Sequence, residues 1–361
     1  MKPDHRLARR SVLLGTPVAT LLGGACQSGP SNPEAGGEWL PRLSENIGAL
    51  DEATLRWMAQ LGLKWVVLQG TDSVDRDRKG YWSEQDIVAV QERCASHGLK
   101  LHSLMLPLAW LTNSMLGRPE RDRDIEHIRT SLAAAGASGV TVVEWRWSPD
   151  FRWGEDVGYY DKPGRGGATY KAFDFDRVRG APPFEEIGSI SREELWERMI
   201  YFTGGVMDAA ESASVKMSLH PKDPPVKAMR GVSRILTSTE EIEAFLDAVP
   251  SPSNGFTFCQ GTVTEMGVDV IDAIRRIGGR GRIHHVHFRA VRGSVPQYEE
   301  TFIDEGDVDM LAAMRAYKEV GYDLAIVSDH SPGIPGDLPG RKIGRSFSHG
   351  YIRGLVQAVN A

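Results

Sequence analysis

The chain of 361 residues is long enough for one large domain or two ordinary ones. With 41% hydrophobic residues, 25% charged residues and nine tryptophans it can bury a sizeable core, which excludes a disordered chain. A net charge of −6 argues against nucleic acid as a partner and against a polybasic membrane-binding surface. Three cysteines exclude a disulfide scaffold. We therefore expect a soluble globular enzyme or binding protein.

Residues 1–26 have the pattern of an export signal. Basic side chains precede an apolar run from Val12 to Leu22, which is too short for a comfortable membrane span, and small residues follow it. The pair Arg9-Arg10 resembles a twin-arginine signal. We expect the mature protein to be periplasmic or otherwise extracytoplasmic. Residues 27–37 are rich in Gly, Pro, Ser and Asn, which predicts a flexible tether.

Cys26 is a candidate lipidation site, because small residues precede it. The match to a lipobox is imperfect, since Gly23 lies where a leucine is usual. A lipid anchor at Cys26 is the one membrane attachment that we expect. The sequence leaves a homo-oligomer open.

From residue 38 onward, short apolar runs alternate with amphipathic stretches. The clearest helical pattern has apolar residues at Leu195, Met199, Phe202 and Val206, in steps of four and three. A last helix is expected from about Ser346 to Val359. Eight runs are expected to be strands: Leu40–Ile47, Lys64–Leu68, Lys100–Leu104, Val140–Glu144, Lys216–Leu219, Gly255–Cys259, Ile283–Phe288 and Asp323–Ser328.

Eight strands, each followed by a helix, favour an α/β fold of the (β/α)8 TIM-barrel type for residues 38–361, as one catalytic domain. An open doubly wound sheet is the alternative, but no Gly-rich phosphate turn follows the first strand. The stretch Trp147–Glu186 has no clear period and is rich in Gly, Pro, Arg and aromatic residues. It predicts a long loop insertion after the fourth strand, lying over the catalytic end of the barrel as a lid or reaching a neighbouring subunit.

Four consecutive strands end in residues that can bind a divalent ion: His220, Cys259, His287 and Asp329. Because side chains alternate along a strand, the first three ligands share a face with small or polar residues such as Ser218 and Thr257. Chemistry in such barrels lies at the carboxyl ends of the strands. The pattern therefore predicts a site for Mn, Fe, Co or Zn.

Several longer motifs closely resemble the mannonate dehydratase family. They are Ser218-Leu219-His220-Pro221-Lys222-Asp223-Pro224-Pro225, Gly255-Phe256-Thr257-Phe258-Cys259-Gln260-Gly261-Thr262, Arg282-Ile283-His284-His285-Val286-His287-Phe288-Arg289, the stretch from Phe302 to Met310, Ser328-Asp329-His330 and Gly344-Arg345. The similarity runs from about Leu40 to the C-terminus. It implies a xylose-isomerase-like barrel that removes water from D-mannonate to give 2-keto-3-deoxygluconate, with Mn2+ or a similar divalent ion.

The resemblance also implies roles for particular residues. The metal ligands would be His220, Cys259, His287 and Asp329, and His330 would be catalytic. Such a reaction removes a proton beside a carboxylate, so a Lewis-acid ion and a histidine that titrates near neutral pH suit it. The remaining candidates are Arg289 as a second catalytic residue that holds the substrate carboxylate, and Arg345, Glu144, Arg146 and Trp147 as substrate contacts.

Two departures from the family keep other functions open. The family usually has a tyrosine in the Gly-rich stretch before the closing Gly-Arg, where residues 339–343 here contain none, and it is normally cytoplasmic. A metal-dependent sugar isomerase or epimerase of the same barrel superfamily is the first alternative. An exported sugar-binding protein with a degenerate site is the second, although all four ligand residues are present.

Overall fold

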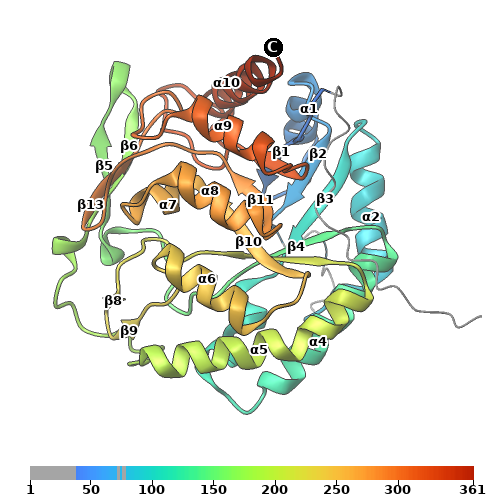
Figure 1. Ribbon diagram of the computed structural model, residues 1–361, viewed down its shortest axis with the longest axis vertical. Coiled ribbons are helices and arrows are strands. Elements are labelled where there is room, and N and C mark those ends of the chain that lie inside the picture. The colour runs from blue at the N-terminus through green and yellow to red at the C-terminus, as the bar shows by residue number, and fades with distance from the viewer. Residues whose placement is uncertain (1–37, 71–73, 75–78) are drawn as a thin grey trace, which may run out of the picture. The chain divides into compact units, whose positions relative to one another are not determined.

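Eight parallel strands close into a barrel, which confirms the expected (β/α)8 architecture (Figure 1). The computed structural model describes residues 38–70, 74 and 79–361, so the expected export signal, the tether and Cys26 lie outside the described residues. All eight expected strands are present, with ends shifted by a residue or two. They are β1 (Arg42–Ile47), β2 (Trp65–Leu68), β3 (Lys100–Met105), β4 (Val142–Arg146), β7 (Lys216–His220), β10 (Asn254–Cys259), β11 (Ile283–His287) and β14 (Ala325–Val327).

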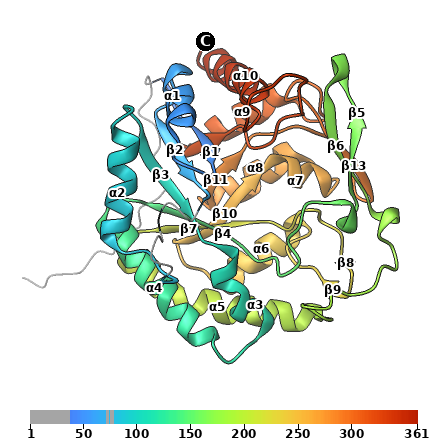
Figure 2. The same cartoon turned by 180° about the vertical axis from the view of Figure 1, so that it is seen from behind.

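Around the barrel the strands follow their order in the chain, and β14 pairs with β1 to close it. Helices cover the outside (Figures 1 and 2). They are α1 (Glu52–Gln60), α2 (Glu84–Ala95), α3 (Thr112–Leu116), α4 (Arg121–Ala137), α5 (Arg192–Ser212), α6 (Thr239–Ala248), α7 (Gln260–Glu265), α8 (Val270–Gly279), α9 (Met310–Glu319) and α10 (Lys342–Asn360). Among residues 38–70, 74 and 79–361, no helix is both long and apolar enough to cross a bilayer.

Local sequence explains why these helices begin and pack where they do. At the start of α5 the Ser191 hydroxyl accepts a hydrogen bond from the Glu194 amide, and the Glu194 carboxylate accepts one from the Ser191 amide. This capping box satisfies amides that the helix itself leaves unpaired. The expected apolar stripe, including Met199 and Phe202, is buried against the barrel. The last helix begins four residues before the expected Ser346, at Lys342.

The insertion after β4 is present, but its middle part contributes two strands to an antiparallel sheet instead of being loop throughout. It contains β5 (Tyr159–Pro163) and β6 (Thr169–Asp174), and β6 pairs with β13 (Gln297–Glu300), which forms a hairpin with β12 (Val291–Ser294) after β11. Figures 1 and 2 show β5, β6 and β13 together at one side of the barrel, away from α2. These strands are not evident from the sequence of the insertion, because part of the apolar face of the sheet comes from β13, much later in the chain.

Buried charges hold the start of the insertion to the loop after β7. Asp150 accepts hydrogen bonds from Lys222 and from both Nε and Nη2 of Arg234, and all three side chains are almost fully buried. Burial lowers the pKa of Lys222 to about 8. Burial opposes ionisation of Asp150, but the two cations outweigh it and lower the pKa of Asp150 to about 2. The loop also carries the two-residue strands β8 (Ala228–Met229) and β9 (Val232–Ser233).

Candidate metal centre and active site

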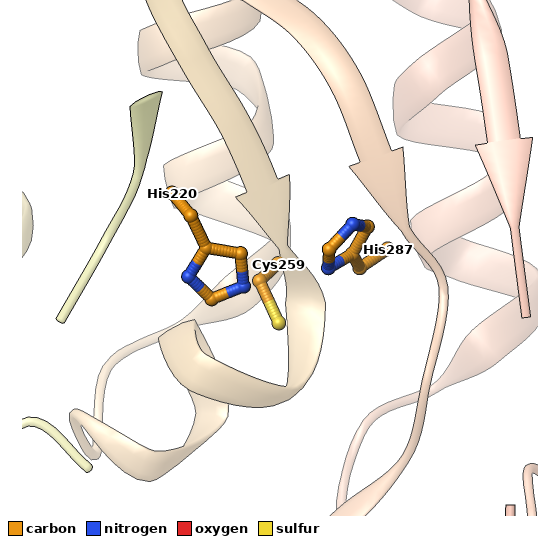
Figure 3. Close-up of side chains that lie close together, drawn as sticks. All are labelled: His220, Cys259 and His287. Atoms are coloured by element: carbon orange, nitrogen blue, oxygen red, sulfur yellow. The ribbon is translucent and has the colours of Figure 1, made fainter. Parts of the chain in front are cut away.

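Three of the four expected metal ligands are the last residues of adjacent barrel strands. His220 ends β7, Cys259 ends β10 and His287 ends β11. One donor atom from each lies within 4.8 Å of the others, and all three residues are buried. Figure 3 shows the two imidazole rings on either side of the Cys259 sulfur. The convergence follows from register, because Cys259 pairs directly with His287 in the β10–β11 ladder.

The expected alternation of side chains is confirmed. Below the ligands, the hydroxyls of Ser218 and Thr257 hydrogen bond to each other at 2.8 Å across β7 and β10. The residues between, including Phe256, Phe258 and Leu219, are buried in the hydrophobic core that includes residues of the surrounding helices. The strands therefore present polar atoms to the barrel interior and apolar ones to the helices, as the sequence predicts.

Asp329 reaches the same group from the strand on the other side of β11. It follows β14, and its Oδ2 lies 3.3 Å from Nδ1 of His287. The backbone of Asp329 has φ +57, a left-handed conformation that costs most residues energy and that aspartate tolerates better than most. The fourth expected ligand is thus held beside His287 by an unusual turn.

Cys259 and His220 are in states that suit a bound cation, whereas His287 must release a proton to bind one. Burial by itself would lower the pKa of His287, but Asp329 and Cys259 raise it to about 10. Burial by itself would raise the pKa of Cys259, but Arg289 and the neighbouring histidines hold it well below the usual range. The thiolate is the form that binds metals. Nδ1 of His220 lies 2.7 Å from the Pro221 carbonyl oxygen, which can only accept, so this nitrogen donates and Nε2 keeps its lone pair. Two imidazoles, a thiolate and a carboxylate form a donor set that fits a divalent transition metal.

Glu144 lies one layer deeper in the barrel than the metal ligands. Its partner across β4 and β7 is Ser218, whereas Arg146 pairs with His220. Glu144 Oε1 accepts a hydrogen bond from Ser103 at 2.6 Å, and Oε2 lies 3.8 Å from Nε2 of His285. Glu144 therefore lies below the ligand layer and does not line the main cavity described below, where we expected it to touch substrate. Its Oε2 is nevertheless 4.0 Å from Nε2 of His287, and Glu144, His285 and His287 form a second group of possible metal donors.

His330, the expected catalytic base, follows Asp329 and is oriented by a carboxylate. Its Nδ1 lies 2.9 Å from Oε1 of Glu300, the last residue of β13, so Nδ1 donates and Nε2 is left with the lone pair. Burial alone would lower the pKa of His330, but Asp329 and Glu300 outweigh it and raise the pKa. The Trp153 ring stands edge-on to the imidazole with the ring centres 5.1 Å apart.

Arg289 is enclosed by acidic side chains. It forms ion pairs with Asp223 at 2.8 Å, Glu265 at 2.9 Å, Asp329 at 3.2 Å and Glu300 at 3.6 Å, and it is 1% exposed. It lines none of the cavities described here. We expected Arg289 to hold the substrate carboxylate. This geometry instead suits Arg289 to holding two protein carboxylates in place, Asp329 beside His287 and Glu300 beside His330.

A cavity of about 550 Å³, here called the main cavity, opens at the carboxyl ends of the strands. This volume is in the range of small-molecule sites. Of the expected substrate contacts, Arg146 and Arg345 line it, together with Asp329 and His330. Trp147 does not: its indole donates a hydrogen bond to the Leu195 carbonyl, and its ring packs on Phe202. Other parts of the wall come from Asn46, from Trp153 and from the segment around Leu106.

Several site residues escaped the sequence reasoning. Besides Glu300, the structure brings the hydroxyls of Tyr159 and Tyr298 to 2.9 and 3.2 Å from Oδ1 of Asp223. Asp223 lies in a quoted motif without an assigned role, and both tyrosines belong to the antiparallel sheet. Burial along β13 gives no alternating signal, because Tyr298, Glu299 and Glu300 are all buried. The roles of Tyr298 and Glu300 become visible only once β13 is known to pair with β6.

Comparison with known proteins relates the sequence to the mannonate dehydratases. A model of the D-mannonate dehydratase (UxuA) family matches residues 174–361. Mannonate dehydratase 2 of Halalkalibacterium halodurans is 28% identical over 87% of this chain and 98% of its own length, and the Thermotoga maritima mannonate dehydratase is 30% identical over 77% and 87%.

Solved structures agree. The crystal structure of mannonate dehydratase from Streptococcus suis serotype 2 superposes with a TM-score of 0.79 and 28% identity, over 89% of this chain and 94% of that one. An L-ribulose 3-epimerase structure has a TM-score of 0.55 at 15% identity, over 89% and 96%, and this likeness shows only the shared barrel fold.

Proposed function

Because the chain belongs to the D-mannonate dehydratase family, we propose that it is a metal-dependent hydro-lyase that converts D-mannonate to 2-keto-3-deoxygluconate and water. One observation carries the assignment: His220, Cys259 and His287 converge, Asp329 lies against His287, and the adjoining cavity is lined by Asp329, the oriented His330 and two arginines. An acidic sugar fits such a cavity, since arginine recognises carboxylates through paired N–H donors.

Dehydration breaks the C–H bond beside the carboxylate and the C–O bond of the next carbon. The proton passes to a base, the hydroxyl leaves with a proton as water, and the resulting enol becomes the keto acid. A divalent ion held by His220, Cys259, His287 and Asp329 would supply Lewis-acid stabilisation of the negative charge that develops beside the carboxylate.

His330 is the group that moves the proton. Glu300 fixes its Nδ1 as the donor, so the proton is accepted and returned at Nε2. A raised pKa makes this imidazole a stronger base, and its proton can then be given to the departing hydroxyl. Arg289 acts through others, by holding Glu300 and Asp329 in their positions.

The direct test is formation of a keto-deoxy sugar acid from D-mannonate by the metal-stripped protein, with and without added Mn2+. We expect product only with the ion and none from His330→Ala. His97→Ala is the matched control, because His97 is on the outer surface, where it contacts Glu52. Stoichiometric metal binding without any product from D-mannonate would contradict the assigned reaction.

A metal-dependent isomerase or epimerase is the second candidate. The stretch from Pro339 to Arg345 holds Arg341 and no tyrosine, which removes a proton-transfer group that the resemblance leads us to expect. The same metal would serve, but the product would keep all its oxygen atoms. Mass spectrometry of the product separates the two reactions, because dehydration lowers the substrate mass by one water.

We propose Mn2+ as the ion, with Fe2+, Co2+ or Zn2+ as alternatives, because the thiolate of Cys259 also suits softer metals. Metal analysis of protein purified without chelators distinguishes them. We also propose that residues 1–26 direct export. Fractionation of cells that produce the full chain should place the protein outside the cytoplasm, and Arg9→Lys with Arg10→Lys should retain it inside.

A further inference from the structure

A second, smaller cavity adjoins the main cavity and is rich in positive charge. This side cavity has a volume of about 250 Å³ and shares Trp153, His330 and Arg345 with the main cavity. Its other lining residues are Lys171, Glu300, Ser331 and Arg341. Because the His330 ring lines both cavities, a molecule that reacts at His330 can extend one end into the side cavity.

The three cations of the side cavity are not equally neutralised. Lys171 pairs with Asp161 at 2.6 Å, and Arg345 pairs with Glu45 at 2.6 Å. Arg341 donates to the Ser331 carbonyl, and within the part of the chain that the structure describes no carboxylate lies within ion-pair distance of it. Its guanidinium therefore keeps N–H donors and a full charge available to a ligand.

The one carboxylate in the lining does not cancel this charge. Glu300 is already engaged by His330 at 2.9 Å and lies 3.6 Å from Arg289. Arg341 itself has φ +56 and follows Gly340, so a non-glycine residue is held in the left-handed region beside the cavity. Such strain costs roughly 1 kcal/mol or more and persists where the surroundings fix the residue.

We propose that the side cavity binds a second anionic group of the substrate, at the end remote from the reacting carbons, and that Arg341 is its principal partner. The inference rests on the proposed function, which places the reacting end of a sugar acid between the metal donors and His330. The side cavity then extends the substrate range beyond D-mannonate to sugar acids with an anion at both ends, such as a dicarboxylate or a phosphorylated acid.

The test compares D-mannonate with D-mannarate, the dicarboxylic acid of the same configuration, on the Mn2+-loaded full chain. We expect kcat/KM to be about tenfold higher for the dicarboxylate, the factor that corresponds to one added charge-assisted contact. Arg341→Met should abolish this preference. Met replaces Arg without changing the strain at a left-handed position, so folding should be unaffected.

Lys342→Met is the matched control. It removes one positive charge at the next position, but Lys342 lines a different groove beside α1. It should keep the preference for D-mannarate. Inorganic phosphate tests the same chemistry without a sugar: it should inhibit D-mannarate turnover in the parent protein and act much more weakly in Arg341→Met.

The inference fails on its own if D-mannonate is turned over but D-mannarate is no better, or if Arg341→Met lowers both equally. If neither acid reacts, the proposed function has failed, and ligand-induced shifts in melting temperature decide the side cavity. A larger shift with D-mannarate than with D-mannonate, lost in Arg341→Met, would uphold it, and equal shifts would overturn it.

Discussion

Glu300 orients the catalytic histidine by charge and by a hydrogen bond, and these contributions can be separated. Glu300→Gln keeps an acceptor for Nδ1 of His330 but removes the negative charge that helps to raise its pKa. We expect kcat to fall by roughly tenfold with little change in KM, and the limb of the pH–rate profile that reports His330 to move to lower pH.

Glu299→Gln is the control for that experiment. Glu299 precedes Glu300 on β13 but pairs with Lys162 and Arg292 on the outer side of the sheet. Its replacement should leave the pH–rate profile unchanged. If Glu300→Gln lowered kcat without moving the profile, Glu300 would be a structural residue only.

Gly261 makes room for the guanidinium that holds the acidic cluster together. A Cβ at this position would lie 2.4 Å from Cζ of Arg289, which four carboxylates hold in place. Gly261→Ala should therefore destabilise the fold by about 1–3 kcal/mol. Urea denaturation measures the loss, and Gly279→Ala, where a Cβ has open space, should cost far less. Equal losses in the two variants would refute the argument.

At this scale the sequence predicts the metal ligands better than their partners. His220, Cys259 and His287 can be found because strand alternation and strand ends are visible in the chain itself. Glu300 and Asp223 cannot be found in this way. Glu300 depends on the pairing of β13 with β6, and Asp223 depends on the tyrosines that this sheet brings to it. Glu144 lies one layer below the ligands and Arg289 is enclosed by four carboxylates, so neither lines the main cavity.

Among the larger elements, the insertion depends on its buried ion cluster. Asp150→Ala would leave Lys222 and Arg234 buried without their carboxylate, which should cost about 3–5 kcal/mol. Arg152→Ala removes an exposed pair with Glu186 and should cost no more than about 1 kcal/mol. Chemical denaturation of both variants checks the contrast, and similar losses would contradict it.

The same cluster sets an acid limit on stability. Because the folded pKa of Asp150 is lowered from 3.8 to about 2, its stabilising contribution is complete above the unfolded value and is lost as the pH falls towards 2. Between pH 5 and pH 2 the parent protein should therefore lose stability more steeply than Asp150→Ala. Melting temperatures measured across that interval test the slope.

The eight barrel strands are predictable because each is a short apolar run bounded by an amphipathic helix. The strands of the insertion are not, since β5 and β6 are partly exposed and complete their sheet with β13 from much later in the chain. The composition of Trp147–Glu186 predicts a loop, but pairing with the distant β13 makes part of this segment a sheet.

For the molecule as a whole, the ion should contribute to stability as well as to catalysis. A ligand that binds only the folded state adds about 2.7 kcal/mol at a hundred times its dissociation constant. Saturating Mn2+ should therefore raise the melting temperature of the stripped protein by several degrees. His220→Asn should lose most of this shift and His97→Asn none of it. An undiminished shift in His220→Asn would place the ion elsewhere.

The four-stranded sheet joins two hairpins that are far apart in the sequence, β5–β6 and β12–β13. The second hairpin carries Glu300, and the insertion that contains the first carries Trp153. Both residues contact His330. A chimera that receives one hairpin from a relative would therefore change two things together. It would alter the pairing between β6 and β13, and it would alter one of the residues that contact His330. The two hairpins should be inherited and exchanged as a pair, so changes of substrate in this lineage are expected to require coordinated substitutions in both.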